Sequence, residues 1–225
     1  LNQAIWLCAA LQDLGNVYNR QEQFAQAEDI ILRSLTIARA LRDRRREAIG
    51  LSHLGIAYIL QCRLTEAESA FRQSLIIAEE LREPFWQALN WLNLGIAYLH
   101  QQHFAEAERA LKQSLNSFHE SGYKHREAEC LRGLGYLFRI QGRMTEALSA
   151  YERTLSIFEE TGNLAFVGNT LMSLALLRHD QADMDEALKL AKRAAGVFAE
   201  IKDTGRMAAA QELIAEIEKA STESA

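Results

Sequence analysis

The stretch LGIAYILQCRLTEAESAFRQSL, from Leu54 to Leu75, decides the fold of this chain. Related strings recur at a constant spacing of 40 residues: LGNVY at Leu14, LGIAY at Leu54 and Leu94, LGYLF at Leu134, and LALLR at Leu174. A second set keeps the same spacing: FAQAE at Phe24, LTEAE at Leu64, FAEAE at Phe104, MTEAL at Met144, and MDEAL at Met184. Five units without insertion or deletion indicate a repeat architecture.

Each unit has the pattern of two amphipathic helices. In the second unit, Leu51, Leu54 and Tyr58 fall on one helical face, and Phe71 and Leu75 fall on one face of the helix that follows. The chain contains one proline, so helix is permitted almost everywhere. Because one hairpin cannot bury its apolar stripes alone, neighbouring hairpins must stack. The sequence therefore predicts an all-α fold, a right-handed α-solenoid of five helical hairpins.

The period also predicts where the units begin and end. We expect repeats at 1–41, 42–81, 82–121, 122–161 and 162–202. A last helix at about 205–220 carries Glu218 where earlier units have tyrosine, and this polar substitution predicts a capping helix with one wet side. The helical pattern is already under way at Leu1, so we expect the chain to be part of a longer protein.

One position of the first helix is always small. It is occupied by Gly15, Gly55, Gly95, Gly135 and finally Ala175. Since glycine inside a helix costs about 1 kcal/mol relative to alanine, its recurrence indicates that another helix passes close by. Alanines recur in the second helix, at 27, 67, 107, 147 and 187, and we expect them to be the partners in a small-to-small contact. Trp6 and Trp86, at equivalent positions, are expected to pack between repeats.

Composition excludes several classes of function. The 225 residues carry a net charge of −5, without the basic excess of a nucleic-acid-binding protein. The one basic cluster, RDRRRE from Arg42 to Glu47, is expected to be a solvated helix start. No apolar run is long enough to cross a bilayer, so no membrane partner is expected. Three cysteines without short spacing indicate reduced thiols and a cytoplasmic setting.

The motifs L-x-x-L-G-x-x-Y and, in the next helix, A-x-x-x-F resemble the tetratricopeptide repeat, and the resemblance covers nearly the whole chain. Units of 40 residues are similar to those of kinesin light chains and of bacterial signalling ATPases of the STAND class. The resemblance implies a scaffold for protein interaction that is the sensor part of a larger signalling or regulatory protein. The carboxylate clamp of chaperone-binding relatives is absent, because Gln12, Asn16, His53, Leu89 and Asn93 stand at its positions.

In that family, one face of each first helix lines a concave groove. The corresponding residues here are Asn16, Asn19, Ile49, Ser52, Ile56, Ile59, Leu89, Leu92, Asn93, Ile96, Leu99, Arg132, Tyr136, Arg139, Met172 and Leu176. The middle of the set is aliphatic and its ends are polar. Two interpretations stay open: adjacent first helices bury these side chains against each other, or an exposed apolar strip accepts an amphipathic helix. Asn16 and Asn93 are candidates for bonding to a partner backbone.

The expected function is thus non-catalytic binding of a protein or peptide through an apolar or amphipathic segment. The alternatives are a small-molecule-sensing regulatory domain and a homo-oligomerisation module. No cofactor is expected, since the glycines are periodic and helical and form no phosphate-binding loop. No metal is expected either, because His100 and His103 lack a clear third ligand. With no catalytic residues evident, the sequence argues against an enzyme.

Overall fold

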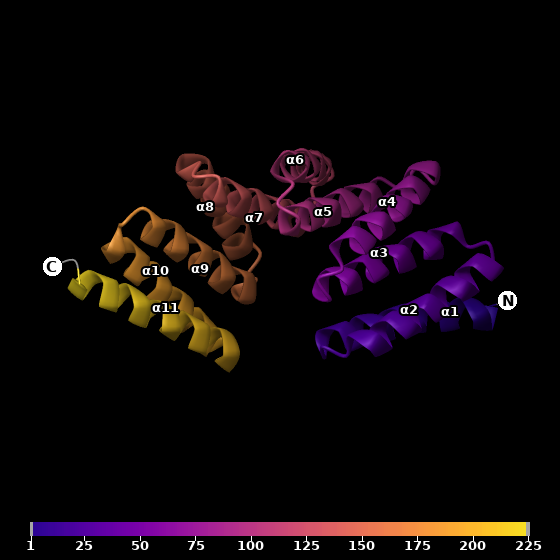
Figure 1. The fold of residues 1–225 in the computed structure, drawn as a ribbon, viewed down its shortest axis with the longest axis horizontal. Helices are drawn as coiled ribbons and strands as arrows, with labels where there is room; N and C mark the ends of the chain where they lie inside the picture. The colour runs from indigo at the N-terminus through magenta and orange to yellow at the C-terminus, as the bar shows by residue number, and fades with distance from the viewer. Residues whose placement is uncertain (1, 224–225) are drawn as a thin grey trace. The chain divides into compact units, whose positions relative to one another are not determined.

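The computed structural model describes residues 2–223, and the side-chain surroundings of residues 3–220. The described chain is helical apart from three-residue turns (Figure 1). Residue 1, with which the first predicted repeat begins, lies outside the described part. The helices are α1 (Asn2–Arg20), α2 (Phe24–Ala40), α3 (Arg44–Leu60), α4 (Leu64–Glu80), α5 (Pro84–His100), α6 (Phe104–Glu120), α7 (Lys124–Ile140), α8 (Met144–Glu160), α9 (Leu164–Asp180), α10 (Met184–Glu200) and α11 (Thr204–Glu223).

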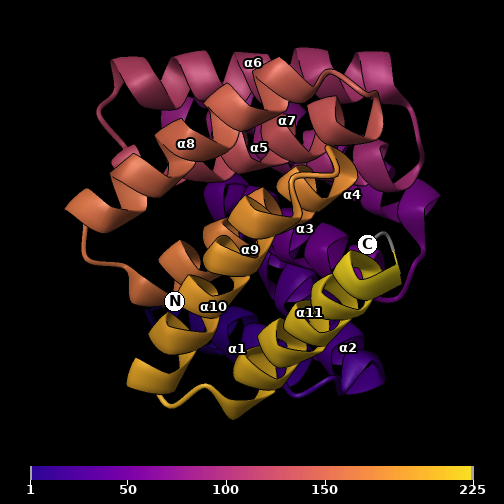
Figure 2. The ribbon, with the colours of Figure 1, turned by 90° about the vertical axis from the view of Figure 1, so that its left-hand side faces the viewer.

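The chain divides into two compact units, Leu1–Glu120 and Ser121–Ala225. The first unit holds three hairpins, in which α1 packs on α2, α3 on α4 and α5 on α6. Consecutive hairpins stack through α2 against α3 and α4 against α5. The second unit holds two hairpins, α7–α8 and α9–α10, followed by α11, which packs on α10 (Figure 2). The predicted all-α fold, an α-solenoid of stacked hairpins, is confirmed. None of the described helices is long and apolar enough to span a membrane.

Every turn between helices has the same geometry. Its second residue has a positive φ, from Glu22 (φ 59°) to Lys202 (φ 57°), and recurs every 20 residues. The next backbone N–H closes the turn on the preceding helix; Arg143 N–H, for example, donates to Phe138 O at 2.8 Å. Glycine occupies the left-handed position in some turns, as at Gly142 (φ 74°), because it has no Cβ that would clash with the backbone there. Turns of constant length and geometry account for the constant 40-residue spacing of the repeat.

The recurring glycine marks the closest approach within each hairpin. A Cβ added at Gly95 would lie 2.6 Å from Leu111 Cγ and 3.3 Å from the Leu111 backbone nitrogen. At Gly55 it would lie 2.5 Å from the Phe71 ring. A large side chain of the second helix thus lies nearest the glycine, and the recurring alanine is a further neighbour in the first hairpin, where a Cβ added at Gly15 would lie 3.6 Å from Ala27 O. The reason is packing, since only a large side chain fills the space above a bare backbone.

The fifth hairpin has different residues at the contact between its first and second helices. Ala175 replaces the glycine, and its counterpart on α10 is Ala191; both are fully buried in one apolar cluster. Thus, where the first helix gains a methyl group, the second helix has a small residue. A close approach in this hairpin occurs instead at Gly168, where an added Cβ would lie 2.5 Å from the Phe198 ring.

A buried hydrogen bond accompanies the glycine contact in successive hairpins. A hydroxyl of the second helix donates to a carbonyl of the first: Ser34 Oγ to Cys8 O at 3.1 Å, Ser74 Oγ to Ala48 O at 2.7 Å, and Ser114 Oγ to Ala88 O at 2.7 Å. Because each hydroxyl is buried, it would be costly if left without a partner. The bond therefore sets the register of one helix along the other.

We expect Gly95→Ala to lower the free energy of unfolding by about 1–3 kcal/mol, as overpacking of a core does. Gly196→Ala is the matched control, because that helical glycine has open space around an added Cβ; it should raise stability by about 0.5–1 kcal/mol. Urea unfolding followed by circular dichroism measures both. In a Leu111→Ala background, Gly95→Ala should cause little further loss of stability. If Gly95→Ala lowers the free energy of unfolding equally in the wild type and in Leu111→Ala, the side chains at 95 and 111 do not compete for this space.

Candidate interaction site

The first helices of the hairpins form one side of each unit. In the first unit α1 contacts α3, and α3 contacts α5, in addition to the packing within hairpins. Among the described helices no comparable packing joins α2 to α4 or α4 to α6. The first helices therefore lie on the inside of the curve of this unit, and we call their surface there the inner face. In the second unit α7 and α9 form the corresponding surface.

Six aliphatic side chains of α3 and α5 are predicted from the sequence to lie at the centre of the inner face in the first unit. We call them the aliphatic strip: Ile49, Ile56, Ile59, Leu89, Ile96 and Leu99. All six are half-buried. Ser52 and Leu92, predicted for the same surface, are buried. The two interpretations left open by the sequence thus apply to different positions: some inner-face residues are enclosed, and the strip keeps part of its surface in contact with water.

Polar side chains join neighbouring first helices. Asn93 Nδ2 of α5 donates to Ser52 Oγ of α3 at 3.3 Å, and Gln12 Nε2 of α1 donates to Arg46 O of α3 at 2.9 Å. Asn16 Nδ2 of α1 lies 3.3 Å from His53 Nε2. Asn16 and Asn93, which the sequence offers as contacts for a partner backbone, are therefore already engaged between helices. Contact between either residue and a partner stays a prediction.

His53 lies at the junction of α1 and α3, next to Asn16. Burial lowers its pKa below the ordinary value, and the nearby Asp13 carboxylate opposes this effect only in part. Asn16 can donate to the ring nitrogen that carries no proton. Protonation would place a charge in a poorly solvated position and remove that acceptor.

Asn19, at the C-terminal end of α1, is an exception to this pairing. It is only 6% exposed, and within the described residues neither its amide nitrogen nor its amide oxygen has a hydrogen-bond partner. The equivalent positions in the next two hairpins are Ile59 and Leu99. An unsatisfied buried polar group costs about 1–3 kcal/mol, so an aliphatic residue would be expected there on grounds of stability alone.

The residues of α7 that the sequence predicts for the groove are basic or aromatic: Arg132, Tyr136 and Arg139. Arg139 Nη1 of α7 donates to Asp180 Oδ2 of α9 at 2.6 Å, and its guanidinium lies 5.9 Å from the centre of the Tyr136 ring. Tyr136 is 46% exposed. Arg132 Nε is buried and, in the described part of the chain, has no hydrogen-bond partner. Beneath them, burial raises the pKa of Tyr151 to about 12, although Arg139 and Arg132 act in the opposite direction.

Met172 and Leu176 of α9 are half-buried against the apolar cluster that α9, α10 and α11 share. Leu213 and Ile217 of α11 are buried members of this cluster. These two predicted groove residues therefore contribute to the core of the last hairpin. Nowhere in the described part of the chain do three His, Cys, Asp or Glu side chains gather as a metal site requires.

Comparison with known proteins agrees with this arrangement. The family model of the tetratricopeptide repeat matches residues 6–80 and 86–160. The chain belongs to the tetratricopeptide repeat family. Repeats of this family typically form non-catalytic modules for protein interaction. No curated protein matches the sequence significantly.

Solved structures share the fold at low sequence identity. BtubC (BKLC) from P. vanneervenii superposes with a TM-score of 0.73 at 22% identity, over 85% of this chain and 80% of that one. A STAND protein with a tetratricopeptide repeat sensor from Pyrococcus horikoshii gives a TM-score of 0.79 at 17% identity; the match covers 92% of this chain but only 32% of that one. A Rap protein complexed with competence and sporulation factor gives 0.69 at 17% identity, over 95% and 64%.

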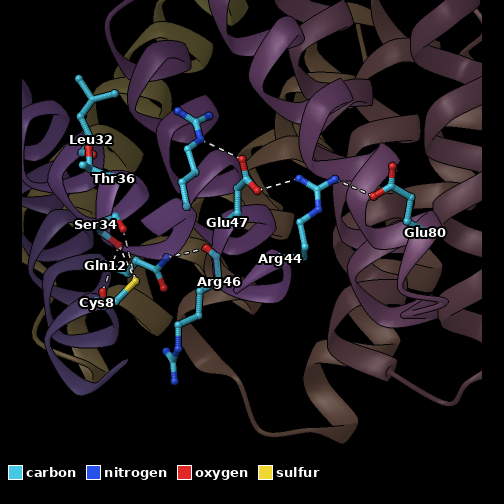
Figure 3. Close-up of polar contacts among 10 residues, drawn as sticks. Cys8, Gln12, Leu32, Ser34, Thr36, Arg44, Arg46, Glu47 and Glu80 are labelled. Carbon is cyan, nitrogen blue, oxygen red and sulfur yellow. Dashed lines mark hydrogen bonds and ion pairs between the residues drawn. The ribbon is translucent and has the colours of Figure 1, made fainter. Parts of the chain in front are cut away.

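The basic run at the start of α3 ties the hairpins of the tetratricopeptide array together. Arg39 of α2 donates to Glu47, Arg44 donates to the same carboxylate at 2.7 Å, and Arg44 also donates to Glu80 of α4 at 2.6 Å (Figure 3). Partial burial would raise the pKa of Glu47, but the hydrogen bonds from Arg39 and Arg44 outweigh it and hold that pKa below its ordinary value. The run begins α3 with Arg42, Arg44 and Arg45 exposed, as expected of a solvated helix start, and its ion pairs in addition connect three helices.

Sequence reasoning left His53 out of the inner face. The sequence could have indicated this role, because His53 and Asn93 occupy the same position of the 40-residue unit. Polar residues at this position, occupied by His53 and by the predicted groove residue Asn93, form contacts between neighbouring first helices. Their partners differ from hairpin to hairpin, so their bonds could not be assigned without the structure.

His53 should make stability depend on pH. Its pKa is lower in the folded than in the unfolded chain, so protonation favours unfolding: the contribution is complete above about pH 6.5 and is lost as the pH falls toward the folded pKa. We expect the urea midpoint of the wild type to fall between pH 7 and pH 5, and to fall less in His53→Gln. Parallel pH profiles of the two proteins would contradict the assignment.

Proposed function

We propose that this tetratricopeptide array is a non-catalytic interaction module, and that the inner face of its first unit binds an amphipathic helix of a partner protein. The observation that carries the proposal is the aliphatic strip: six half-buried aliphatic side chains from α3 and α5. The typical role of the family supports it.

The strip suits a partner that is apolar on one side only. Covering the exposed part of each aliphatic side chain contributes about 25 cal/mol per Å² of apolar surface. At the α1 side the surface turns polar, with Asn16 and the unsatisfied amide of Asn19. An amide both donates and accepts, and because both amide atoms of Asn19 are enclosed, its side chain turns outward on binding to pair with a polar group on the rim of a bound segment. A helix with an apolar stripe and polar flanks fits this combination.

The remaining predictions become parts of the same proposal. The second unit contributes its own contact surface, centred on the exposed Tyr136 with Arg132 and Arg139. The five repeats keep the predicted limits, α11 acts as the cap, and the array serves as the sensor part of a larger signalling protein in the cytoplasm. The solved Rap complex and the STAND sensor, which share the fold, support a role of this kind.

The decisive test is a double variant of the strip, Ile56→Asp with Ile96→Asp. Affinity capture from the native host's extract identifies the partner, and calorimetry with the purified partner segment gives its affinity. A carboxylate placed against an apolar surface costs more than about 1.4 kcal/mol, so two should weaken binding by about 100-fold or more. Ile56→Ala with Ile96→Ala, a milder change, should weaken binding by about tenfold and covers the case in which the charged variant unfolds.

The matched control is Leu32→Asp with Ile76→Asp, two exposed aliphatic residues on the second helices α2 and α4. It adds the same charge at a distance from the inner face and should leave binding unchanged, with circular dichroism showing that every variant is helical. Equal affinity of the strip variant and the wild type would overturn the proposal. Loss of binding in the control alone would place the partner on the second helices.

Asn19→Leu separates binding from folding. Since the amide has no partner in the described structure and the next hairpins have Ile59 and Leu99 there, the free energy of unfolding should stay the same or rise by about 1 kcal/mol. Affinity for the partner segment should fall by about five- to tenfold. A clear loss of stability instead would mean that Asn19 is held by a structural partner such as a buried water.

A further inference from the structure

The outer edge of the first hairpin is apolar where the corresponding edge of other hairpins is covered. Four residues of α1 form this N-terminal edge: Trp6, Leu7, Leu14 and Val17. Leu14 is 38% exposed and Val17 46%. The residues at the same positions of the next hairpin, Leu54 and Ala57, are 6% and 0% exposed. Trp6, expected to pack between repeats, is 74% exposed.

The helix that covers this edge in the other hairpins is known from the chain itself. In the second hairpin Leu54 and Ala57 are buried in a cluster with Ile31 and Leu35 of α2, the second helix of the preceding hairpin. In the third hairpin α4 packs against α5 in the same way. The N-terminal edge of α1 therefore has the composition of a contact between hairpins.

A hollow beside α1 supports the same conclusion. It has a volume of about 340 Å³ and is lined by Tyr18, Ala25, Gln26, Asp29 and Ile30. One repeat later, a cleft of about 260 Å³ is lined by four residues at the same repeat positions, Tyr58, Glu66, Ser69 and Ala70. Its opposite wall is supplied by the preceding second helix, through residues including Leu32, Leu35 and Arg39. The first hollow thus corresponds to one wall of such a cleft.

We propose that the N-terminal edge of α1 docks the second helix of another hairpin of the same repeat type, placed before α1. The internal contacts define the chemistry of that helix. Tyr98 Oη and Gln101 Nε2 contact Glu68 of α4 at 3.4 and 3.1 Å, and Tyr18 and Gln21 occupy their positions in the first hairpin. The docked helix accordingly carries Glu-x-x-apolar-x-x-x-Leu, as in Glu28-x-x-Ile31-x-x-x-Leu35.

A second copy of this chain is a poor occupant through its C-terminal edge. There α11 turns Leu213 and Ile217 inward and exposes Glu212, Glu216 and Lys219. Such a charged surface would bury unpaired carboxylates against Leu14 and Val17. The N-terminal edge is separate from the aliphatic strip, so this inference can hold whether or not the inner face binds a helix.

The test extends the protein by its own hairpin. Residues 44–83, which hold α3, α4 and the turn after α4, are placed before Ala4, so that the 40-residue register continues. The added segment contains no tryptophan. With Trp86 and Trp91 replaced by Phe, the remaining Trp6 reports on its surroundings. We expect its emission to shift to shorter wavelength and its quenching by acrylamide to fall in the extended protein.

Leu14→Asp supplies the decisive comparison, with Ile140→Asp as its matched control, since Ile140 is 41% exposed in the second unit. In the extended protein Leu14→Asp should lower the urea midpoint strongly, but in the parent chain only slightly; Ile140→Asp should have the same small effect in both. An equal effect of Leu14→Asp in the two proteins would overturn the proposal. So would a parent chain that sedimentation shows to be a dimer dissociated by Leu14→Asp, because the occupant would then be a second copy.

Discussion

The close approach of the two helices at one glycine controls each of the first four hairpins. At Gly55 or Gly95 the backbone of the first helix meets a large side chain of the second at a distance that leaves no room for a methyl group. The contact brings the helices near enough for a buried hydroxyl of one to reach a carbonyl of the other. Because interiors are packed as densely as crystals, this contact fixes both the separation and the register of the pair.

Stacking follows from that geometry. A hairpin whose helices touch so closely has apolar side chains left on both flanks, and these flanks pack on the flanks of the next hairpin. The first helices then lie near one another and must satisfy their polar side chains between neighbours, as Asn93 and Ser52 do. The aliphatic strip is what this packing leaves half-covered, which is why we propose it as the surface that binds a partner.

Ion pairs connect neighbouring hairpins in addition to this apolar packing. Ion pairs among Arg39, Arg44, Glu47 and Glu80 connect α2, α3 and α4. Among the described helices, no comparable helix packing joins α2 to α4. Exposed ion pairs contribute little individually, but the Glu47 carboxylate is partly buried and shared by two arginines, so this network contributes more than a single surface pair. The apolar edge of α1 lacks such a network: Leu7 stands where the next hairpin has Glu47.

Much of the fold could be predicted from the sequence, because its determinants are local or periodic. Apolar residues at helical spacing indicate the helices, and the 40-residue repeat, kept by turns of constant length, indicates the stacked hairpins. The candidate site could be predicted only as a set of positions on one face. A sequence period shows which way a side chain points but does not measure how far a neighbouring hairpin covers it.

The sequence by itself thus determined an all-α array of five hairpins and the helical face that carries Ile56 and Ile96. The tertiary structure decided that these two are half-buried whereas Leu92 is buried, and that the neighbour of Gly95 is Leu111 and not an alanine. It also decided that Asn19 is buried without a partner among the described residues. The physical reason is that burial and hydrogen bonding depend on side chains brought together from different helices, whose distances no periodic pattern contains.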